Sequence, residues 1–138
     1  MNMLDGRITE IITADEISLV RVSTGTCLLN TVIIDSPATN PGLRTGHQVK
    51  LLFKETEVIL SKTFLLDISI RNRIECRVKK ITAGKILCEI TLIISDTNPS
   101  VEIQSIITQT ACEELNLQEN DKILALIKTN EVSLLTND

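Results

Sequence analysis

A short polar segment in the middle of the chain carries side chains suited to binding a small anion. Ser69 supplies a hydroxyl, Arg71 a guanidinium and Asn72 an amide. Lys128 would lie close to them if the second half of the chain closes into a barrel. A tetrahedral oxyanion is held by several convergent donors of these kinds. The alternative interpretation is a polar linker in which Arg71 forms a surface ion pair with Asp67.

Residue patterns typical of common enzymes are missing from the sequence. It has no GxxxxGK[ST] phosphate loop, no HExxH, no GxSxG and no GxGxxG. His47 follows Gly46 and is expected to be an exposed turn histidine. Cys88 and Cys112 are expected to be small core residues, because lone cysteines in strands more often are core residues than nucleophiles. We therefore expect a binding protein rather than an enzyme.

The composition argues against a nucleic-acid partner. Among 138 residues, the aromatic ones are Phe53 and Phe64, and the net charge is −4. Proteins that grip single-stranded nucleic acid usually stack bases on aromatic rings, and general polyanion binders are usually basic. If an anion binds here, a local pocket must hold it rather than the field of the whole protein.

The cysteine pattern and the hydropathy point to a cytoplasmic protein. Its four cysteines form no CxxC pair, which argues against a structural zinc site and favours reduced thiols. No signal peptide opens the sequence, and no apolar run approaches the roughly 18 residues of a membrane span. Direct membrane insertion is therefore not expected.

Alternating apolar residues and turn signals predict ten strands and one short helix. The segments 49–54 and 58–61 are expected to form a hairpin around residues 55–57. The helix is expected over 110–117, with Thr110 as its cap and Glu113 three residues later. The predicted strands are 7–12, 17–22, 27–34, 49–54, 58–61, 75–81, 86–94, 101–107, 122–128 and 132–135.

The sequence repeats itself once. Residues 4–8 align with 74–78 at an offset of 70, and residues 49–54 align with 123–128 at an offset of 74. Lys54 therefore matches Lys128. Five strands in about 65 residues predict a small Greek-key barrel of the OB type for each copy. The expected fold is all-β, a tandem of two barrels over 1–63 and 64–138.

Each barrel is small enough to have a thin core. Domains of this size are marginal alone, and one small barrel cannot bury all the Ile, Leu and Val of this chain. We therefore expect the copies to pack on each other or on a second chain, as a homo-oligomer.

Two motifs resemble one known family. The residues S-I-R-N at 69–72 are similar to the S-x-R-N signature that opens a Mop domain, also called a TOBE domain. The tail resembles that family's "EELGL … GD.V.ALIKA" ending, with EELNL at 113–117 and ALIK at 125–128. The resemblance covers about residues 67–136.

The resemblance implies an OB-like fold that binds molybdate or tungstate in pockets formed where subunits meet. Carried over, Ser69, Arg71, Asn72 and Lys128 would form the ligand shell. Ile70 would contribute through its backbone. Side chains and backbone amides together hold the oxyanion in this family, in agreement with the donors found in the sequence.

The first copy resembles the family less. Asn2 falls on Asn72, but Met1 falls on Arg71, so the S-x-R-N opening is missing. Lys54 is kept, although Glu55 and Glu57 beside it disfavour an anion. A loop over 37–42 replaces the helix. The first copy is therefore expected to support the second rather than to bind.

The sequence favours one function and leaves two alternatives open. The favoured interpretation is the regulatory C-terminal part of a molybdate importer's ATP-binding subunit, which the chain resembles and which would associate with transporter subunits at the inner face of the membrane. A second interpretation is a stand-alone molbindin, which stores molybdate in the cytoplasm. A third is a structural dimerisation module without a ligand. The missing phosphate loop means that the ATPase itself does not lie in this chain.

Overall fold

The computed structural model describes residues 1–95 and 100–136, which form an all-β protein with one short α-helix. All ten expected strands are present there, with shifted ends. The elements are β1 (Asn2–Ala14), β2 (Ile17–Ser23), β3 (Leu28–Ile33), β4 (Gln48–Phe53), the 3-10 turn η1 (Glu55–Glu57), β5 (Ile59–Ser61), β6 (Asn72–Thr82), β7 (Leu87–Ser95), β8 (Val101–Thr108), α1 (Gln109–Glu114), β9 (Lys122–Ile127), the 3-10 turn η2 (Thr129–Glu131) and β10 (Ser133–Thr136).

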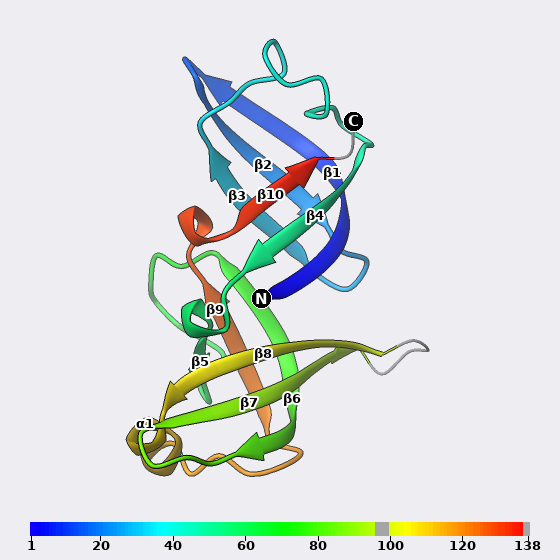
Figure 1. Ribbon diagram of the computed structural model, residues 1–138. Helices are drawn as coiled ribbons and strands as arrows, with labels where there is room; N and C mark the ends of the chain where they lie inside the picture. Colours follow the sequence, from blue (N-terminus) through cyan, green and yellow to red (C-terminus); the bar gives the residue numbers. More distant parts are fainter. Residues whose placement is uncertain (96–99, 137–138) are drawn as a thin grey trace. The chain divides into compact units, whose positions relative to one another are not determined.

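The strands form two five-stranded antiparallel sheets, each completed by a strand from the other copy of the repeat (Figure 1). The first sheet has the order β10-β4-β1-β2-β3, and the second has the order β5-β9-β6-β7-β8. The expected hairpin of residues 49–54 with 58–61 is therefore wrong. The η1 turn leads β5 away from β4, and β5 pairs with β9 instead. In the same way, η2 leads β10 to β4.

Contacts accordingly group the chain into two compact units. The first unit contains Met1–Phe53 and the residues from Lys128 onward, and the second contains Lys54–Ile127. The segments 1–63 and 64–138 thus describe the sequence repeat, whereas strand exchange decides which residues pack together. The chain passes between the units at Phe53–Lys54 and at Ile127–Lys128.

A buried hydrogen bond holds each exchanged strand, and the two bonds occupy matching positions in the repeat. The Thr31 hydroxyl donates to the carbonyl of Val132 in the first unit. In the second unit, the Ser105 hydroxyl donates to the carbonyl of Val58 at 2.8 Å. These residues correspond at an offset of 74, so both copies use the same bond for the strand received in exchange.

Backbone irregularities also repeat. The ladder of β1 with β2 is interrupted between Ile8 and Glu10, and that of β6 with β7 between Val78 and Lys80. A β-bulge bends a strand and increases its twist, so the long strands β1 and β6 can pair with a different neighbour on each side. Gly46 and Asn120, which match in the repeat, both have positive φ, at 92° and 72°.

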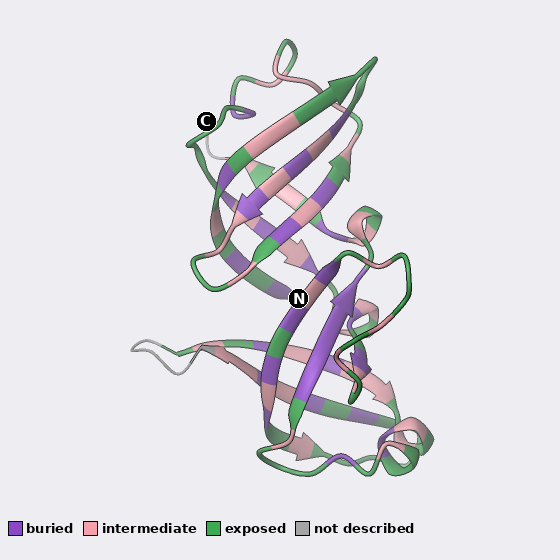
Figure 2. Ribbon diagram, turned by 180° about the vertical axis from the view of Figure 1, so that it is seen from behind, coloured by how far each residue is buried: buried purple, intermediate pink, exposed green. Residues whose placement is uncertain are grey.

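Burial alternates along most strands, as expected for sheets with one face on a core (Figure 2). The strand β9 differs, because its last five residues are all buried. The fully buried large side chains of the first unit include Ile8, Val20, Leu29, Leu43, Leu51 and Phe53. Those of the second include Ile74, Ile90, Leu92, Ile103, Ile123 and Ile127.

The helix α1 begins earlier than expected. Its N-cap is Thr108, whose hydroxyl accepts a hydrogen bond from the backbone N–H of Ala111 at 3.1 Å. The prediction of Thr110 as the cap is wrong, because Thr108 ends β8 in an extended conformation while Thr110 already lies inside the helix. A cap residue needs this non-helical backbone.

The first copy has a turn-rich loop where the second has its helix, as expected. The Asp35 carboxylate organises this loop by accepting hydrogen bonds from the Thr39 hydroxyl, the Ser36 backbone N–H and the Asn40 amide. These bonds, led by that of Thr39, lower the pKa of Asp35. Within residues 1–95 and 100–136, no helix is long and apolar enough to cross a membrane.

Candidate functional site

The site predicted from the sequence is centred on the start of β6. Asn72 is the first residue of this strand, and its side chain is fully buried. Its backbone pairs with Ile127, the last residue of β9. The pairing therefore places Asn72 next to the strand end from which Lys128 continues, and it fixes the position of the amide side chain within the second unit.

The residues before Asn72 form an irregular segment at the surface. Ser69 and Arg71 are exposed, and Ile70 is half-buried. The Arg71 guanidinium folds back onto this segment, where it donates to the carbonyls of Ile68 and Ser69. The structure thus keeps the predicted donors together in one short stretch, but the Arg71 cation faces loop carbonyls rather than converging with the Ser69 hydroxyl.

Arg73 holds the segment in place and was missed by the sequence analysis. Its Nε donates to the carbonyl of Ile70 at 3.0 Å, and its Nη2 donates to the carbonyls of Leu66 and Ile68 at 3.1 and 3.3 Å. The available signal was a second arginine in the sequence R-N-R. A planar guanidinium can hold several carbonyls at once, so Arg73 fixes the backbone that presents Ser69 and Arg71.

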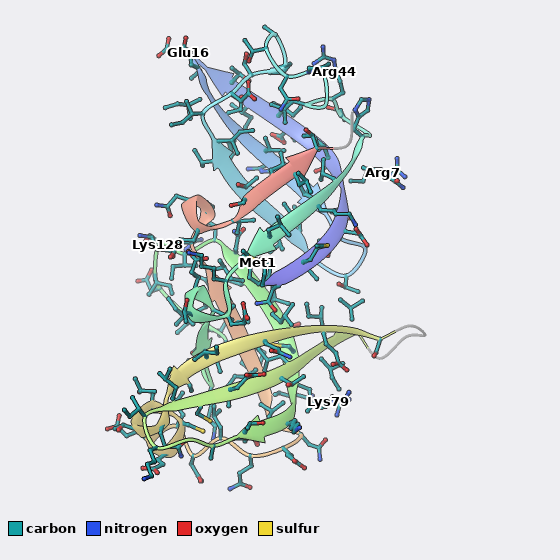
Figure 3. All side chains as sticks on the ribbon, in the orientation of Figure 1. Met1, Arg7, Glu16, Arg44, Lys79 and Lys128 are labelled. Carbon is teal, nitrogen blue, oxygen red and sulfur yellow. The ribbon has the colours of Figure 1, made fainter. Side chains whose placement is uncertain are left out.

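Lys128 lies between β9 and η2 (Figure 3). It is exposed and extended, with φ −64° and ψ 143°, and its carbonyl accepts from the backbone N–H of Glu131 at 3.0 Å. No ion pair of Lys128 is found among the residues that the structure describes. Lys128 is thus an exposed residue that directly follows, in the chain, the residue paired with Asn72.

The first copy keeps half of this arrangement. Asn2 begins β1, is almost fully buried and pairs with Phe53. Lys54 follows Phe53 as Lys128 follows Ile127. The guanidinium position is not kept, because Met1 stands where the second copy has Arg71. The backbone geometry is therefore common to both copies, whereas the Arg71 guanidinium belongs to the second.

Metal binding and thiol chemistry find little support. In the described part of the chain, no group of three or more His, Cys, Asp or Glu residues is placed to hold a metal ion. The four cysteines are free, and Cys76, Cys88 and Cys112 are buried. Burial raises the pKa of the Cys88 thiol to about 11, with further contributions from the neighbouring Cys112. This thiol stays protonated near neutral pH and is a poor nucleophile.

Comparison with known proteins identifies the second copy. Residues 68–134 match the TOBE domain family, so the match begins one residue before S-I-R-N. No curated protein is similar enough in sequence to match the chain.

Among solved structures, the chain is similar to the cytoplasmic molybdate-binding protein ModG in its molybdate-bound form. The identity is 26% over 99% of this chain and 96% of ModG, with a TM-score of 0.88. A molybdate-binding protein from Sporomusa ovata is 32% identical over 46% of this chain and 88% of its own length, with a TM-score of 0.41. The ModG likeness extends through both copies of the repeat.

Proposed function

Because this chain belongs to the TOBE domain family, also called Mop, we propose that it is a cytoplasmic molybdate-binding protein. The observation that carries the proposal is its likeness to molybdate-bound ModG along nearly the whole of both chains. The donors at the start of β6 give the proposal a site. It is a site for a bound anion, not for catalysis.

We place the oxyanion at the start of β6. The Ser69 hydroxyl, the Ile70 backbone N–H and the Asn72 amide would donate to its oxygens, with Arg71 and Lys128 supplying positive charge. Charge-assisted hydrogen bonds of this kind are the stronger class. Arg71 is exposed, so its guanidinium can turn from the carbonyls of Ile68 and Ser69 to the anion. Tungstate has similar size and charge and would fit the same donors.

Assembly of several copies is part of this proposal. Large apolar side chains remain exposed within the described residues, including Ile34, Leu65 and Ile86 at 86%, 95% and 77%. A homo-oligomer would cover such side chains, and sites shared between subunits would link assembly to the ligand. Light scattering with and without molybdate should then show a ligand-dependent change in mass.

The biological role that we favour is storage or buffering of molybdate by a stand-alone protein. It is favoured because ModG is similar along 96% of its own length, with no large additional part unmatched. The alternative is the regulatory part of an importer's ATP-binding subunit, which would associate with transporter subunits at the membrane. A neighbouring reading frame for such a subunit would favour the importer.

Calorimetric titration of the whole chain with molybdate, and with sulfate as a second anion, tests the proposed function. We expect saturable heat with molybdate. Replacing Arg71 and Lys128 together by alanine should weaken binding by at least about tenfold, because two cations are lost. Lys54→Ala is the matched control, since it removes the equivalent lysine of the first copy, and it should leave the affinity unchanged.

Two results would contradict the proposal at different levels. No heat at millimolar molybdate would leave a ligand-free structural module. Binding that survives the double replacement of Arg71 and Lys128 would keep the function but place the anion elsewhere.

A further inference from the structure

The first unit contains a polar cavity that shares no residue with the proposed oxyanion site. Its volume is about 440 Å³, and β1, β2 and β4 contribute its lining. At its centre, Arg7 of β1 pairs with Ser23 of β2 on one side and with Gln48 of β4 on the other. The volume falls in the range of roughly 300–1,000 Å³ that is typical of small-molecule sites.

The cavity offers more donors than its own residues use. Arg7 donates through Nη1 to the carbonyl of Gly46 at 2.6 Å, which leaves its other N–H groups without an acceptor in the described structure. The Ser23 hydroxyl accepts from the Gly25 backbone at 3.4 Å, and its own proton has no acceptor there. No hydrogen bond of the Gln48 side-chain amide is found among the described residues. Figure 3 shows the Arg7 side chain extending outward from β1.

Lys50 adds a second cation to the lining. Its Nζ lies 2.8 Å from Oδ1 of Asp5, whose side chain is 82% exposed. An ion pair in contact with solvent contributes little, so an incoming anion can compete with Asp5 for the ammonium group. The lining thus has two cations and one carboxylate, although the protein as a whole carries a charge of −4.

The equivalent place in the second unit has a different character. A cavity of about 300 Å³ lies there, beside Arg77, which the repeat aligns with Arg7. Ile93 stands in the position of Ser23, and Phe64 adds an aromatic ring. The Arg77 Nη1 donates to Oδ1 of Asn120 at 3.0 Å, so a side chain rather than a backbone carbonyl occupies it. Glu75 and Lys122 complete that second lining, so two cations and one carboxylate are present in both units. What belongs to the first unit alone is the Ser23 hydroxyl and the Gln48 amide beside the arginine.

Glycine at position 6 allows β1 to pack closely against β2 in the first unit. A Cβ there would lie 2.4 Å from Cγ1 of Val22 and 2.9 Å from the carbonyl oxygen of Ser23. In the second unit this position is Cys76, which is buried and directs its Sγ toward the carbonyl of Ile123 at 3.4 Å. The missing side chain at Gly6 therefore serves the packing of β1 against β2 beside the cavity.

We propose that this cavity binds a small organic anion that carries a carboxylate or phosphate group. Arg7 and Lys50 hold the charged group, because a guanidinium matches the oxygens of either group through paired N–H donors. Ser23 and Gln48 hydrogen-bond the polar body of the ligand. The volume favours an organic anion over a bare tetrahedral oxyanion, and the lining contains no aromatic ring that would favour an apolar ligand.

Amide chemical shifts of the whole ¹⁵N-labelled chain, titrated with citrate, ribose 5-phosphate and uncharged ribose, test this proposal. Saturable shifts at the amides of Gly6, Arg7, Ser23 and Gln48 with either charged probe support it, and the probe that saturates identifies the group bound. Arg7→Gln should weaken that binding at least about tenfold, whereas the matched Arg77→Gln should change it by less than about twofold.

Any of four outcomes, from three kinds of measurement, would overturn the assignment. One is the absence of saturation with both charged probes up to about 10 mM. Another is an equal response to uncharged ribose, or an affinity unchanged by Arg7→Gln. The fourth is a molybdate titration that saturates at the same four amides, which would make the cavity a second oxyanion site instead.

Discussion

The two units share one strand arrangement but carry different residues at their surfaces. At the start of the long central strand, the second unit has Arg71, Asn72 and Arg73, with Arg73 holding the segment before it. The first unit has Met1, Asn2 and Met3 at these positions. Near the bulge of that strand, the first unit has the Ser23 hydroxyl and the Gln48 amide beside Arg7, where the second unit has Ile93 and Lys122 beside Arg77. The repeated backbone thus leaves each copy free to develop a different surface.

Exchanging the residues at positions 6 and 76 is expected to give the largest change in the free energy of unfolding. Gly6→Cys should lower the free energy of unfolding by about 2–3 kcal/mol, since its Cβ would clash with Val22 and with the backbone of Ser23. Val22 is buried and β-branched, so it cannot turn aside easily. Urea unfolding followed by circular dichroism measures the change.

Cys76→Gly is the reciprocal control. It removes a small buried side chain and adds backbone freedom, at a cost of about 1–2 kcal/mol. A Gly6→Cys protein as stable as the unmodified chain would show that the first unit does not need glycine there.

The exchanged strands should respond alike in both units. Thr31→Val removes the hydroxyl that bonds the Val132 carbonyl, and Ser105→Ala removes the one that bonds the Val58 carbonyl. Each should cost about 1–2 kcal/mol, because a buried carbonyl loses its donor. The same unfolding measurement applies, and effects that differ by more than about 2 kcal/mol would argue against equivalent roles.

Arg73→Met gives the second copy the residue that the first copy has at position 3. Loss of the bonds to the carbonyls of Leu66, Ile68 and Ile70 should weaken molybdate binding by about tenfold, with little change in stability. Hydrogen exchange at residues 66–71 should become faster, which a loss of ligand contact alone would not produce. Lys79→Met, on the exposed surface of β6, is the control. If molybdate affinity and hydrogen exchange at residues 66–71 are both unchanged, Arg73 does not hold the segment of the proposed site.

Replacing Cys88 is expected to give the smallest effect on stability, and this effect appears only at high pH. Burial raises the pKa of this thiol from its ordinary value of 9.0 to about 11. Between these values the unfolded chain loses the proton that the folded chain retains, so this contribution to stability is present below pH 9 and declines as the pH rises toward 11. Cys88→Ala should make the decline shallower in urea unfolding series, and parallel pH profiles of the two proteins would contradict the assignment.

The sequence was sufficient to predict the elements and their repeat. β-branched residues alternating with turn signals predicted every strand, and the offsets of 70 and 74 agree with bulges and positive-φ residues at matching positions. The fold class, two OB-like barrels with one short helix, is confirmed by the likeness to ModG. The S-I-R-N segment, Asn72 and Lys128 stand out from residue types and spacing, and their role as ligands remains a prediction.

The tertiary structure decided which strands pair and which donors are free. A three-residue turn such as η1 or η2 is compatible with a hairpin or with a strand that leaves its neighbour, and only the partner sheets select the exchange of β5 and β10. Arg73 was not recognised because its role depends on three carbonyls whose directions are set by the fold. The polar cavity was missed for the same reason. Arg7, Ser23 and Gln48 are far apart in sequence, and only the registers of β1 with β2 and β4 bring them into one row.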